Sequence, residues 1–280
     1  MSDFDFKKKK KYGQNFLTSD RIPKKIVEQS GITKDFGVIE IGAGQGILTQ
    51  QLLNTAKNVI SVEIDEELIP FLNEKFKNYN NFLLINDDIL KVDLNKYIES
   101  HFKEMSVAVC ANLPYYITTP ILMKLLEGKH GFKTITVMVQ KEVASRLVSF
   151  KGDKEYGAIT AVCNYYANVK KLFNVSAGCF SPPPKVDSAV IRFDLYDAPP
   201  VKLDNEKLFF DVIKAAFNQR RKTFVNSSNS FFNNNYSKDL ITEILNELNK
   251  NINIRGEELD IHDFAFISNK LNKYTLEEKQ

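Results

Sequence analysis

The sequence predicts an α/β protein with a doubly wound, parallel sheet, followed by a small all-α domain. Short apolar runs alternate with amphipathic segments over about 190 residues, a pattern typical of parallel sheets with crossover helices. A glycine-rich turn joins the first strand to a helix, as in nucleotide-binding α/β folds. Pro199 and Pro200 end this alternation, and only helical patterns follow. These three observations define the predicted fold class.

The first part of the chain is expected to hold seven strands, with helices between all but the last two. The expected strands are Val38–Ile41, Val59–Ile64, Phe82–Ile85, 107–111, Ile135–Val139, Val169–Phe173 and Asp187–Leu195. The expected helices are Ile22–Gln29, Ile47–Leu53, Glu66–Phe76, Asn95–Phe102, Thr119–Leu126, Lys141–Ser149 and Ala158–Tyr166.

Three regions are expected along the chain. Residues 1–11 form a basic N-terminal arm, residues 12–198 form the α/β domain, and residues 199–280 form the helical C-terminal domain. In the last region, helical periodicity covers 206–217, 238–249 and 260–272. The stretch from Asn226 to Tyr236 is rich in serine and asparagine, has little periodicity, and receives no predicted element.

The composition is that of a globular protein. The chain has 280 residues, is 43% hydrophobic and carries a net charge of +3. No apolar run reaches the ~18–20 residues of a membrane span, and no signal-peptide pattern is present. The cysteines, Cys110, Cys163 and Cys179, are odd in number and widely spaced, and the three histidines lack metal-ligand spacing. We therefore expect a cytoplasmic protein without a metal.

Basic residues gather in clusters although the net charge is small. The clusters are Lys7–Lys11, Arg21–Lys25, Lys170–Lys171 and Arg220–Lys222. A basic face on a nearly neutral protein is a common feature of proteins that bind a phosphate backbone. For any one cluster, solvated lysines are usually the better explanation.

Polar groups follow the first three strands, where open α/β sheets bind ligands. Gly42, Gly44 and Gly46 lie between strand and helix in a G-x-G-x-G spacing, which differs from the pyrophosphate motif G-x-G-x-x-G. Glu63 ends the second strand and is placed to bind two ribose hydroxyls. Asp88 follows the third strand and is placed to accept a hydrogen bond from an adenine amine. The set predicts a phosphate-free adenosine ligand, S-adenosylmethionine, unless these are structural turns with solvated acids.

The fourth strand is followed by a rigid corner, NLPYY at 112–116. Pro114 restricts the backbone on both sides of itself. The corner offers acceptor oxygens and aromatic faces but no obvious nucleophile, acid or base. It is suited to holding a planar amine, and ordinary aromatic packing is the alternative.

Five motifs in order resemble the rRNA adenine dimethyltransferase family. They are GQNFL at 13–17, EIGAG at 40–44, EID at 63–65, NLPY at 112–115 and FSPPPKVDSAV at 180–190. The resemblance covers about residues 11 to 275 and implies a Rossmann-like class I S-adenosylmethionine-dependent methyltransferase domain. It implies dimethylation of the exocyclic amine of two adjacent adenosines near the 3' end of 16S rRNA, within the immature 30S subunit, by a monomer.

Within the family, two motifs resemble the 16S branch, which is linked to kasugamycin sensitivity. These are NLPYYITTP at 112–120 and FNQRRKT at 217–223. Two other functions stay open, namely methylation of 23S rRNA as in macrolide resistance and a non-catalytic role beside ribosomes or transcription. The intact NLPY motif argues against the non-catalytic role.

The resemblance also implies roles for individual residues. Asn112 and the Pro114 carbonyl would accept the two hydrogens of the target amine, while Tyr115 and Phe180 would stack on the flipped base. Cofactor contacts are implied for Gln14, Asn15, Leu17, Gly42, Gly44, Glu63, Asp88 and Asn112. RNA contacts are implied for Arg220, Arg221 and Lys222. The role of Tyr116 stays open.

Overall fold

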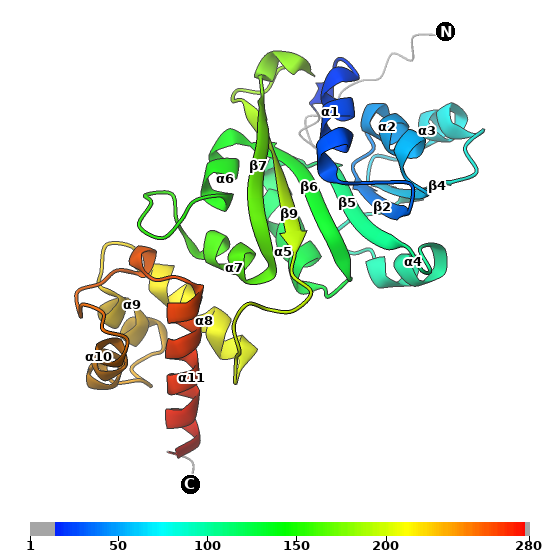
Figure 1. Ribbon diagram of the computed structural model, residues 1–280. Coiled ribbons are helices and arrows are strands. Elements are labelled where there is room, and N and C mark those ends of the chain that lie inside the picture. Colours follow the sequence, from blue (N-terminus) through cyan, green and yellow to red (C-terminus); the bar gives the residue numbers. More distant parts are fainter. Residues whose placement is uncertain (1–14, 278–280) are drawn as a thin grey trace. The chain divides into compact units, whose positions relative to one another are not determined.

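The computed structural model describes residues 15–277, which pack into two compact units (Figure 1). Unit 1 runs up to Ala144 and includes Val169–Leu195, whereas unit 2 contains Ser145–Asn168 and the residues from Tyr196 on. The sequence instead placed 145–168 in the α/β domain. Tyr156 and Tyr165 explain the difference, because both are buried in the core of the helical unit. The basic arm predicted at 1–11 lies outside the described residues.

The centre of unit 1 is a seven-stranded sheet of order β4-β3-β2-β5-β6-β9-β7. Its strands are β2 (Phe36–Ile41), β3 (Asn58–Glu63), β4 (Phe82–Asn86), β5 (Ser106–Asn112), β6 (Phe132–Gln140), β7 (Ala167–Val175) and β9 (Ser188–Leu195). A separate two-stranded sheet pairs β1 (Phe16–Leu17) with β8 (Phe180–Ser181). The predicted α/β class is confirmed.

The sheet is parallel from β4 through β6, and β9 then runs antiparallel to β6. The prediction of an all-parallel sheet is therefore wrong at β9. The segment between β7 and β9 contains only the short 3-10 helix η3 (Ala177–Cys179) and β8. Parallel neighbours need a long crossover, usually a helix, and this segment has none.

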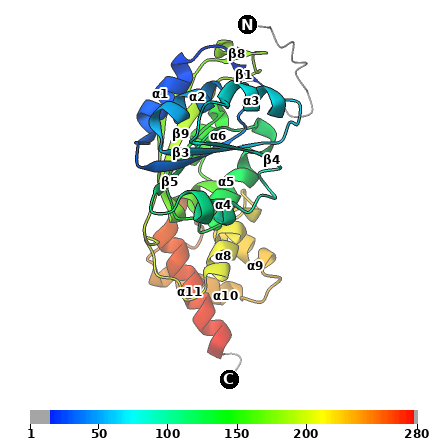
Figure 2. The same ribbon diagram turned by 90° about the vertical axis from the view of Figure 1, so that its right-hand side faces the viewer.

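Helices cover both faces of the sheet, as expected for a doubly wound fold. Figure 2 shows α1 (Arg21–Ser30), α2 (Ile47–Thr55) and α3 (Ile69–Phe76) on one face, with α4 (Leu94–His101) and α5 (Thr118–Glu127) on the other. The central strands β2 and β5 are buried almost throughout and read as continuous apolar runs for that reason. Their carboxyl ends form a switch point, since the chain moves outward from β2 to β4 and then returns to β5.

Unit 2 is helical and has its own apolar core. Its helices include α7 (Ala158–Tyr166), α8 (Glu206–Asn218), α9 (Phe224–Phe231), α10 (Lys238–Glu247) and α11 (Ile261–Glu277), while α6 (Lys141–Leu147) leads into it from β6. A short 3-10 helix, η4 (Gly256–Glu258), precedes α11. No helix among residues 15–277 has the length and apolar character needed to cross a bilayer.

Helix α9 lies in the serine- and asparagine-rich stretch that received no predicted element. Thr223 caps it by accepting a hydrogen bond from the Asn226 amide. Phe224 is buried, and Ser227 enters the core by donating from Oγ to the Ala215 carbonyl at 2.6 Å. A buried serine satisfied by the backbone of another helix behaves as a core residue, although its polarity hides the helical pattern.

Candidate active site

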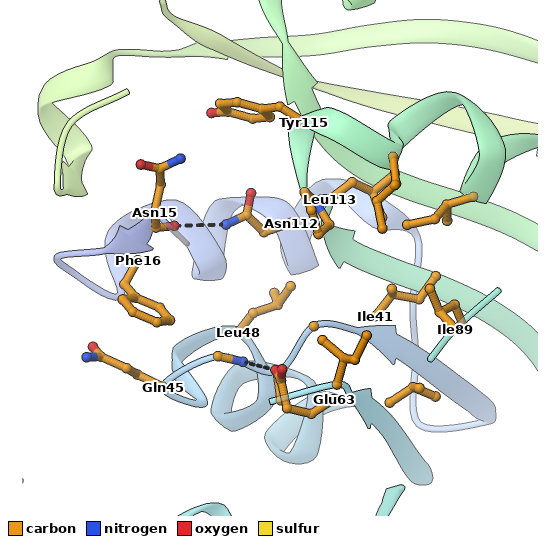
Figure 3. A pocket seen from close by; sticks show the side chains of 18 of the residues that line it. Asn15, Phe16, Ile41, Gln45, Leu48, Glu63, Ile89, Asn112, Leu113 and Tyr115 are labelled. Carbon is orange, nitrogen blue, oxygen red and sulfur yellow. Dashed lines mark hydrogen bonds between the residues drawn. The ribbon is translucent and has the colours of Figure 1, made fainter. Parts of the chain in front are cut away.

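A cavity opens at the carboxyl ends of β2, β3, β4 and β5 in unit 1 (Figure 3). Nine of the predicted site residues line it: Asn15, Leu17, Gly42, Gly44, Glu63, Asp88, Asn112, Pro114 and Tyr115. Gln14 lies outside the described residues, and Phe180 is not among the lining residues. The structure thus brings the polar ends of four neighbouring strands to one place.

The glycine turn requires glycine for two physical reasons. Gly44 has φ +56, a left-handed conformation that L side chains rarely adopt, and its amide donates to Glu63 Oε2 at 2.9 Å. At Gly46 a Cβ atom would lie 2.6 Å from the Phe76 ring. The ammonium of Lys75 further secures the turn by donating to the Gln45 carbonyl at 2.7 Å. The turn is therefore fixed from several sides.

Glu63 links the ends of β2 and β3. Its second oxygen, Oε1, accepts a hydrogen bond from the Asp65 amide at 2.9 Å. The side chain is buried, and burial raises the pKa of the Glu63 carboxyl above its ordinary value. Backbone amides, those of Gly44 and Asp65 among them, occupy part of the capacity of this carboxylate, which offers about four lone-pair sites. The remaining capacity is available to hydroxyl groups of a ligand bound in the cavity.

Asp88 stands at the end of β4, beside Asp87. Its Oδ1 accepts from the Leu90 amide at 3.0 Å, and its own amide donates to Asp87 Oδ1 at 2.7 Å. Asp88 is half-buried while Asp87 is exposed. One Asp88 oxygen therefore closes the turn, and the other accepts no hydrogen bond from residues 15–277, which leaves it available to a ligand.

Asn112 ends β5 with its amide oriented by the N-terminal segment. Its Nδ2 donates to the Asn15 carbonyl at 3.5 Å, and its Oδ1 points toward the side of the cavity where Tyr115 lies (Figure 3). This orientation presents the oxygen, an acceptor, to the cavity. The role of holding an amine stays a prediction.

The Pro114 carbonyl is already engaged, unlike the prediction for it. It accepts from the Thr118 hydroxyl at 3.1 Å and from the Ile117 amide at 3.3 Å. Both lone pairs are thus used by the turn that starts α5. The neighbouring Leu113 carbonyl accepts no hydrogen bond from residues 15–277, and Leu113 also lines the cavity.

The two phenols of the corner differ in how they are held. The Tyr115 hydroxyl lies 2.6 Å from the Ser188 hydroxyl on β9, and burial raises the pKa of the Tyr115 phenol. That hydrogen bond anchors the Tyr115 ring beside the cavity. Tyr116 lies at the rim with 57% of its surface exposed.

Phe180 lies in the apolar core of unit 1. It is 3% exposed and belongs to a cluster that includes Leu17 and Val190. Its backbone pairs with Leu17 across the β1–β8 sheet. In this conformation the ring packs inside the protein, and stacking on a base requires the segment that carries it to move.

Glu40 is a buried carboxyl next to the glycine turn. Its Oε2 accepts from the Thr49 hydroxyl at 2.7 Å and from the Ser61 hydroxyl at 2.5 Å, while Oε1 has no partner among the described residues. Burial raises the pKa of Glu40 to about 7, against the opposing effect of the two hydroxyls. The carboxyl joins three segments of unit 1: β2, α2 and β3.

Several lining residues escaped the sequence analysis. Phe16, Gln45, Ile64 and Ile89 border the cavity, and Ile64 is 40% exposed, which is unusual for a residue next to a buried strand. The signal for Ile64 and Ile89 was their position directly after Glu63 and Asp88. An apolar residue after a polar strand end is placed to pack against the flat face of a ligand.

The basic element of unit 2, Arg220–Lys222, connects α8 to α9. All three side chains are exposed. Arg220 donates to the Lys154 carbonyl and forms an ion pair with Glu257, with Nε 3.4 Å from Oε2. Arg221 and Lys222 make no ion pair within the described part of the chain. Arg220 is thus a structural link, and its two neighbours are available to an anion.

No group of three or more His, Cys, Asp or Glu side chains within residues 15–277 is arranged to hold a metal ion. Burial raises the pKa values of the Cys110 and Cys163 thiols, which disfavours the thiolate that metals bind. The expectation of a metal-free protein stays a prediction.

Comparison with known proteins gives a consistent result. The ribosomal RNA adenine dimethylase family matches residues 5–271. A protein named ribosomal RNA small subunit methyltransferase A from Lachnoclostridium phytofermentans is 46% identical over 265 residues, covering 94% of this chain and 91% of the relative. The protein of the same name from Clostridium botulinum is 44% identical, covering 96% and 95%.

Solved structures agree over nearly the whole chain. A dimethyladenosine transferase from Plasmodium falciparum superposes with a TM-score of 0.80 at 28% identity, covering 93% of this chain and 98% of that one. The 23S rRNA methyltransferase ErmE has a TM-score of 0.70 at 23% identity, covering 92% and 100%. The second likeness concerns the fold alone.

Proposed function

This chain belongs to the ribosomal RNA adenine dimethylase family, and on that premise we propose that it dimethylates two adjacent adenosines in a hairpin near the 3' end of 16S rRNA. The activity, S-adenosylmethionine-dependent adenine methylation of rRNA, follows from the family. The choice of 16S over 23S rRNA is supported by relatives at 44–46% identity that are named for the small subunit. The 23S-type and non-catalytic alternatives are not favoured.

The cavity residues fit the methyl donor. Glu63 would hold the ribose hydroxyls with its remaining lone pairs, and the free oxygen of Asp88 would accept from the adenine amine. Gly42, Gly44, Asn15 and Leu17 would border the rest of the molecule. When bound, S-adenosylmethionine supplies an electrophilic methyl group.

Asn112 carries the proposed chemistry. The exocyclic nitrogen of adenine is a weak nucleophile because its lone pair is delocalised into the ring. An acceptor at Asn112 Oδ1 would favour the pyramidal nitrogen and stabilise the positive charge that develops on it. Since the Pro114 carbonyl is occupied, we propose the Leu113 carbonyl as the second acceptor. No strong base is needed, because the proton leaves to water after transfer.

The target base must leave its stack to reach these acceptors. Tyr115, anchored through Ser188, offers a fixed ring, and Tyr116 offers an exposed one at the rim. Contact of a base with Phe180 would follow a rearrangement of β8. Arg221 and Lys222 would bind phosphates, while Arg220 would hold the local structure that presents them.

The direct test is transfer of labelled methyl groups to undermethylated 30S particles, with 50S particles and free 16S rRNA in parallel. We expect dimethyladenosine at two adjacent positions in 30S particles, found by mass spectrometry. Methylation of 50S particles alone would favour the 23S alternative, and cofactor binding without transfer to any RNA would favour a non-catalytic role. We further propose that the protein is cytoplasmic and acts as a monomer. Sedimentation at assay concentration tests the monomeric state.

A further inference from the structure

One segment of unit 2, residues 149–156, presents an aromatic ring to solvent. Phe150 is 74% exposed, more than any other exposed large hydrophobic residue in the described chain. Single apolar residues on a surface are ordinary, so exposure alone assigns no role. The surroundings of this ring distinguish it.

The segment is anchored at both ends and closed by its own hydrogen bonds. Ser149 and Tyr156 are buried, and the Tyr156 ring packs edge-on against Phe217 with centroids 5.8 Å apart. The Phe150 amide donates to Asp153 Oδ2 at 2.8 Å, and the Asp153 amide donates back to the Phe150 carbonyl at 3.0 Å. The backbone beneath the ring is therefore defined, and binding need not order it further.

The same segment is tied to the basic element at the end of α8. The Gly152 amide donates to the Glu257 carbonyl at 2.8 Å, and the Glu257 carboxylate pairs with Arg220. The Arg220 guanidinium also donates to the Lys154 carbonyl. Glu257 and Arg220 thus fasten the segment that carries Phe150 to the segment that carries Arg221 and Lys222.

The cations around this junction divide into two groups. Lys151 pairs with Asp260, and Arg220 is used as described. Lys154, Arg221 and Lys222 are exposed and form no ion pair within residues 15–277. The result is one exposed ring among unpaired positive charges, which is the composition of sites that bind single-stranded nucleic acid. An apolar protein partner would instead need a contiguous apolar patch.

We propose that Phe150, Lys154, Arg221 and Lys222 form one RNA contact, in which an unpaired base of the rRNA stacks on Phe150 while the cations bind the adjacent phosphates. The inference rests on the proposed function, because it takes rRNA as the substrate. It adds a base contact in the helical unit, separate from the cavity of unit 1.

The sequence has no tryptophan, which allows a direct optical test. F150W introduces a single tryptophan at the proposed contact. L276W is the matched control, because Leu276 is 55% exposed in the same unit, about 22 Å along α11 from its first residue. With protein-free 16S rRNA transcript as the probe, we expect emission from F150W to be quenched on binding and emission from L276W to change little.

Binding measurements complete the test. F150A and F150L should each lower affinity for the transcript about 10-fold, the size of one base stack, while F150W retains affinity. The salt dependence of binding should be unchanged in F150A, because the ring contacts no phosphate. Triple replacement of Lys154, Arg221 and Lys222 by alanine should reduce the salt slope by about two, at roughly 0.7 for each phosphate contact to a single strand.

Two results would overturn the inference. One is wild-type affinity of F150A with unquenched F150W in the RNA complex. The other is that F150A loses affinity for 30S particles but keeps its affinity for the transcript. That result would indicate a ribosomal protein as the partner. Either result leaves the proposed function intact if the wild-type protein still dimethylates 30S particles. Absence of that methylation would instead remove the proposed function itself.

Discussion

The cavity of unit 1 and the proposed RNA contact of unit 2 are built in different ways. The cavity is made of strand ends whose polar groups are fixed by backbone hydrogen bonds, as with Glu63 between the Gly44 and Asp65 amides. The proposed contact in unit 2 is made of exposed side chains, and the segments that carry them are linked through Arg220, Glu257 and Lys151. We therefore expect fixed geometry to govern binding in the cavity and charge to govern binding at the proposed RNA contact. Substitutions in the two regions should therefore change different observables.

The largest effect is expected for Asn112→Ala, which removes the acceptor for the target amine. The rate of single-turnover methyl transfer should fall about 10²–10³-fold, the range for losing one group that stabilises developing charge. RNA affinity should stay within about twofold, since binding energy comes mainly from phosphate contacts. Asn54→Ala on the exposed side of α2 is the control. Unchanged turnover in Asn112→Ala would show that Asn112 does not act in methyl transfer, and the cavity would then not be distinguished from unit 2 by its effect on rate.

The next effect concerns Glu40 and pH. Its folded pKa of about 7 lies above the ordinary value of 4.5, so the folded state holds a proton that the unfolded state releases between these values. Stability should therefore fall as pH rises from about 4.5 to 7 and level off above it, by up to about 3 kcal/mol from this group. Glu40→Gln should flatten this slope, as measured by denaturant unfolding at several pH values. An identical slope in the variant would show that Glu40 does not titrate there.

Glu63→Gln should weaken cofactor binding about 10- to 100-fold, the range for losing charged hydrogen bonds. The amide of glutamine would also turn a donor toward the Gly44 or Asp65 amide. Calorimetric titration with S-adenosylhomocysteine measures the effect, with Glu66→Gln, an exposed neighbour, as the control. Equal dissociation constants for wild type and Glu63→Gln would exclude Glu63 as a ligand of the cofactor.

The smallest effect separates Arg221 from Arg220. Arg221→Ala should weaken RNA binding severalfold and reduce the salt slope by about one, because one phosphate contact is lost. Arg220→Ala should leave the salt slope nearly unchanged, since that guanidinium is bonded to Lys154 and Glu257. Filter binding at several salt concentrations distinguishes the two. Identical slopes for both variants would show that the internal links of Arg220 do not persist in the RNA complex.

The sequence predicted the elements whose physical requirement is local. The glycine turn, Glu63, Asp88 and Asn112 each follow a buried strand, and parallel strands bring such ends together. The antiparallel direction of β9 follows from the segment between β7 and β9, which has no crossover helix. Apolar periodicity does not indicate the direction of a strand. The domain boundary failed in a similar way, because the burial of Tyr156 and Tyr165 in the helical core depends on distant partners.

Two site residues and one helix show the limits at finer scale. The motif identified the Pro114 carbonyl as an acceptor for the target amine. In the structure this carbonyl already accepts hydrogen bonds from Ile117 and Thr118, which the sequence alone does not indicate. Phe180 belongs to a motif with a stiff proline-rich continuation, yet its ring is in the core. Helix α9 was not predicted because Ser227 is polar, and polarity scales treat a serine as exposed. In the structure Ser227 is buried and donates a hydrogen bond to another helix.

The hydrogen bond from Asn112 to the Asn15 carbonyl joins residues 97 positions apart. It makes the rotation of the amide depend on where the chain before α1 is seated, although the sheet itself is complete without that segment. A shortened protein that starts at Thr18 would lose β1 but keep the seven-stranded sheet and the glycine turn, and the Asn112 amide could then turn either its oxygen or its nitrogen toward the substrate. In the full-length protein, we expect the β1–β8 pairing to fix the segment next to Asn15. The pairing would thereby keep the Asn112 oxygen directed into the cavity.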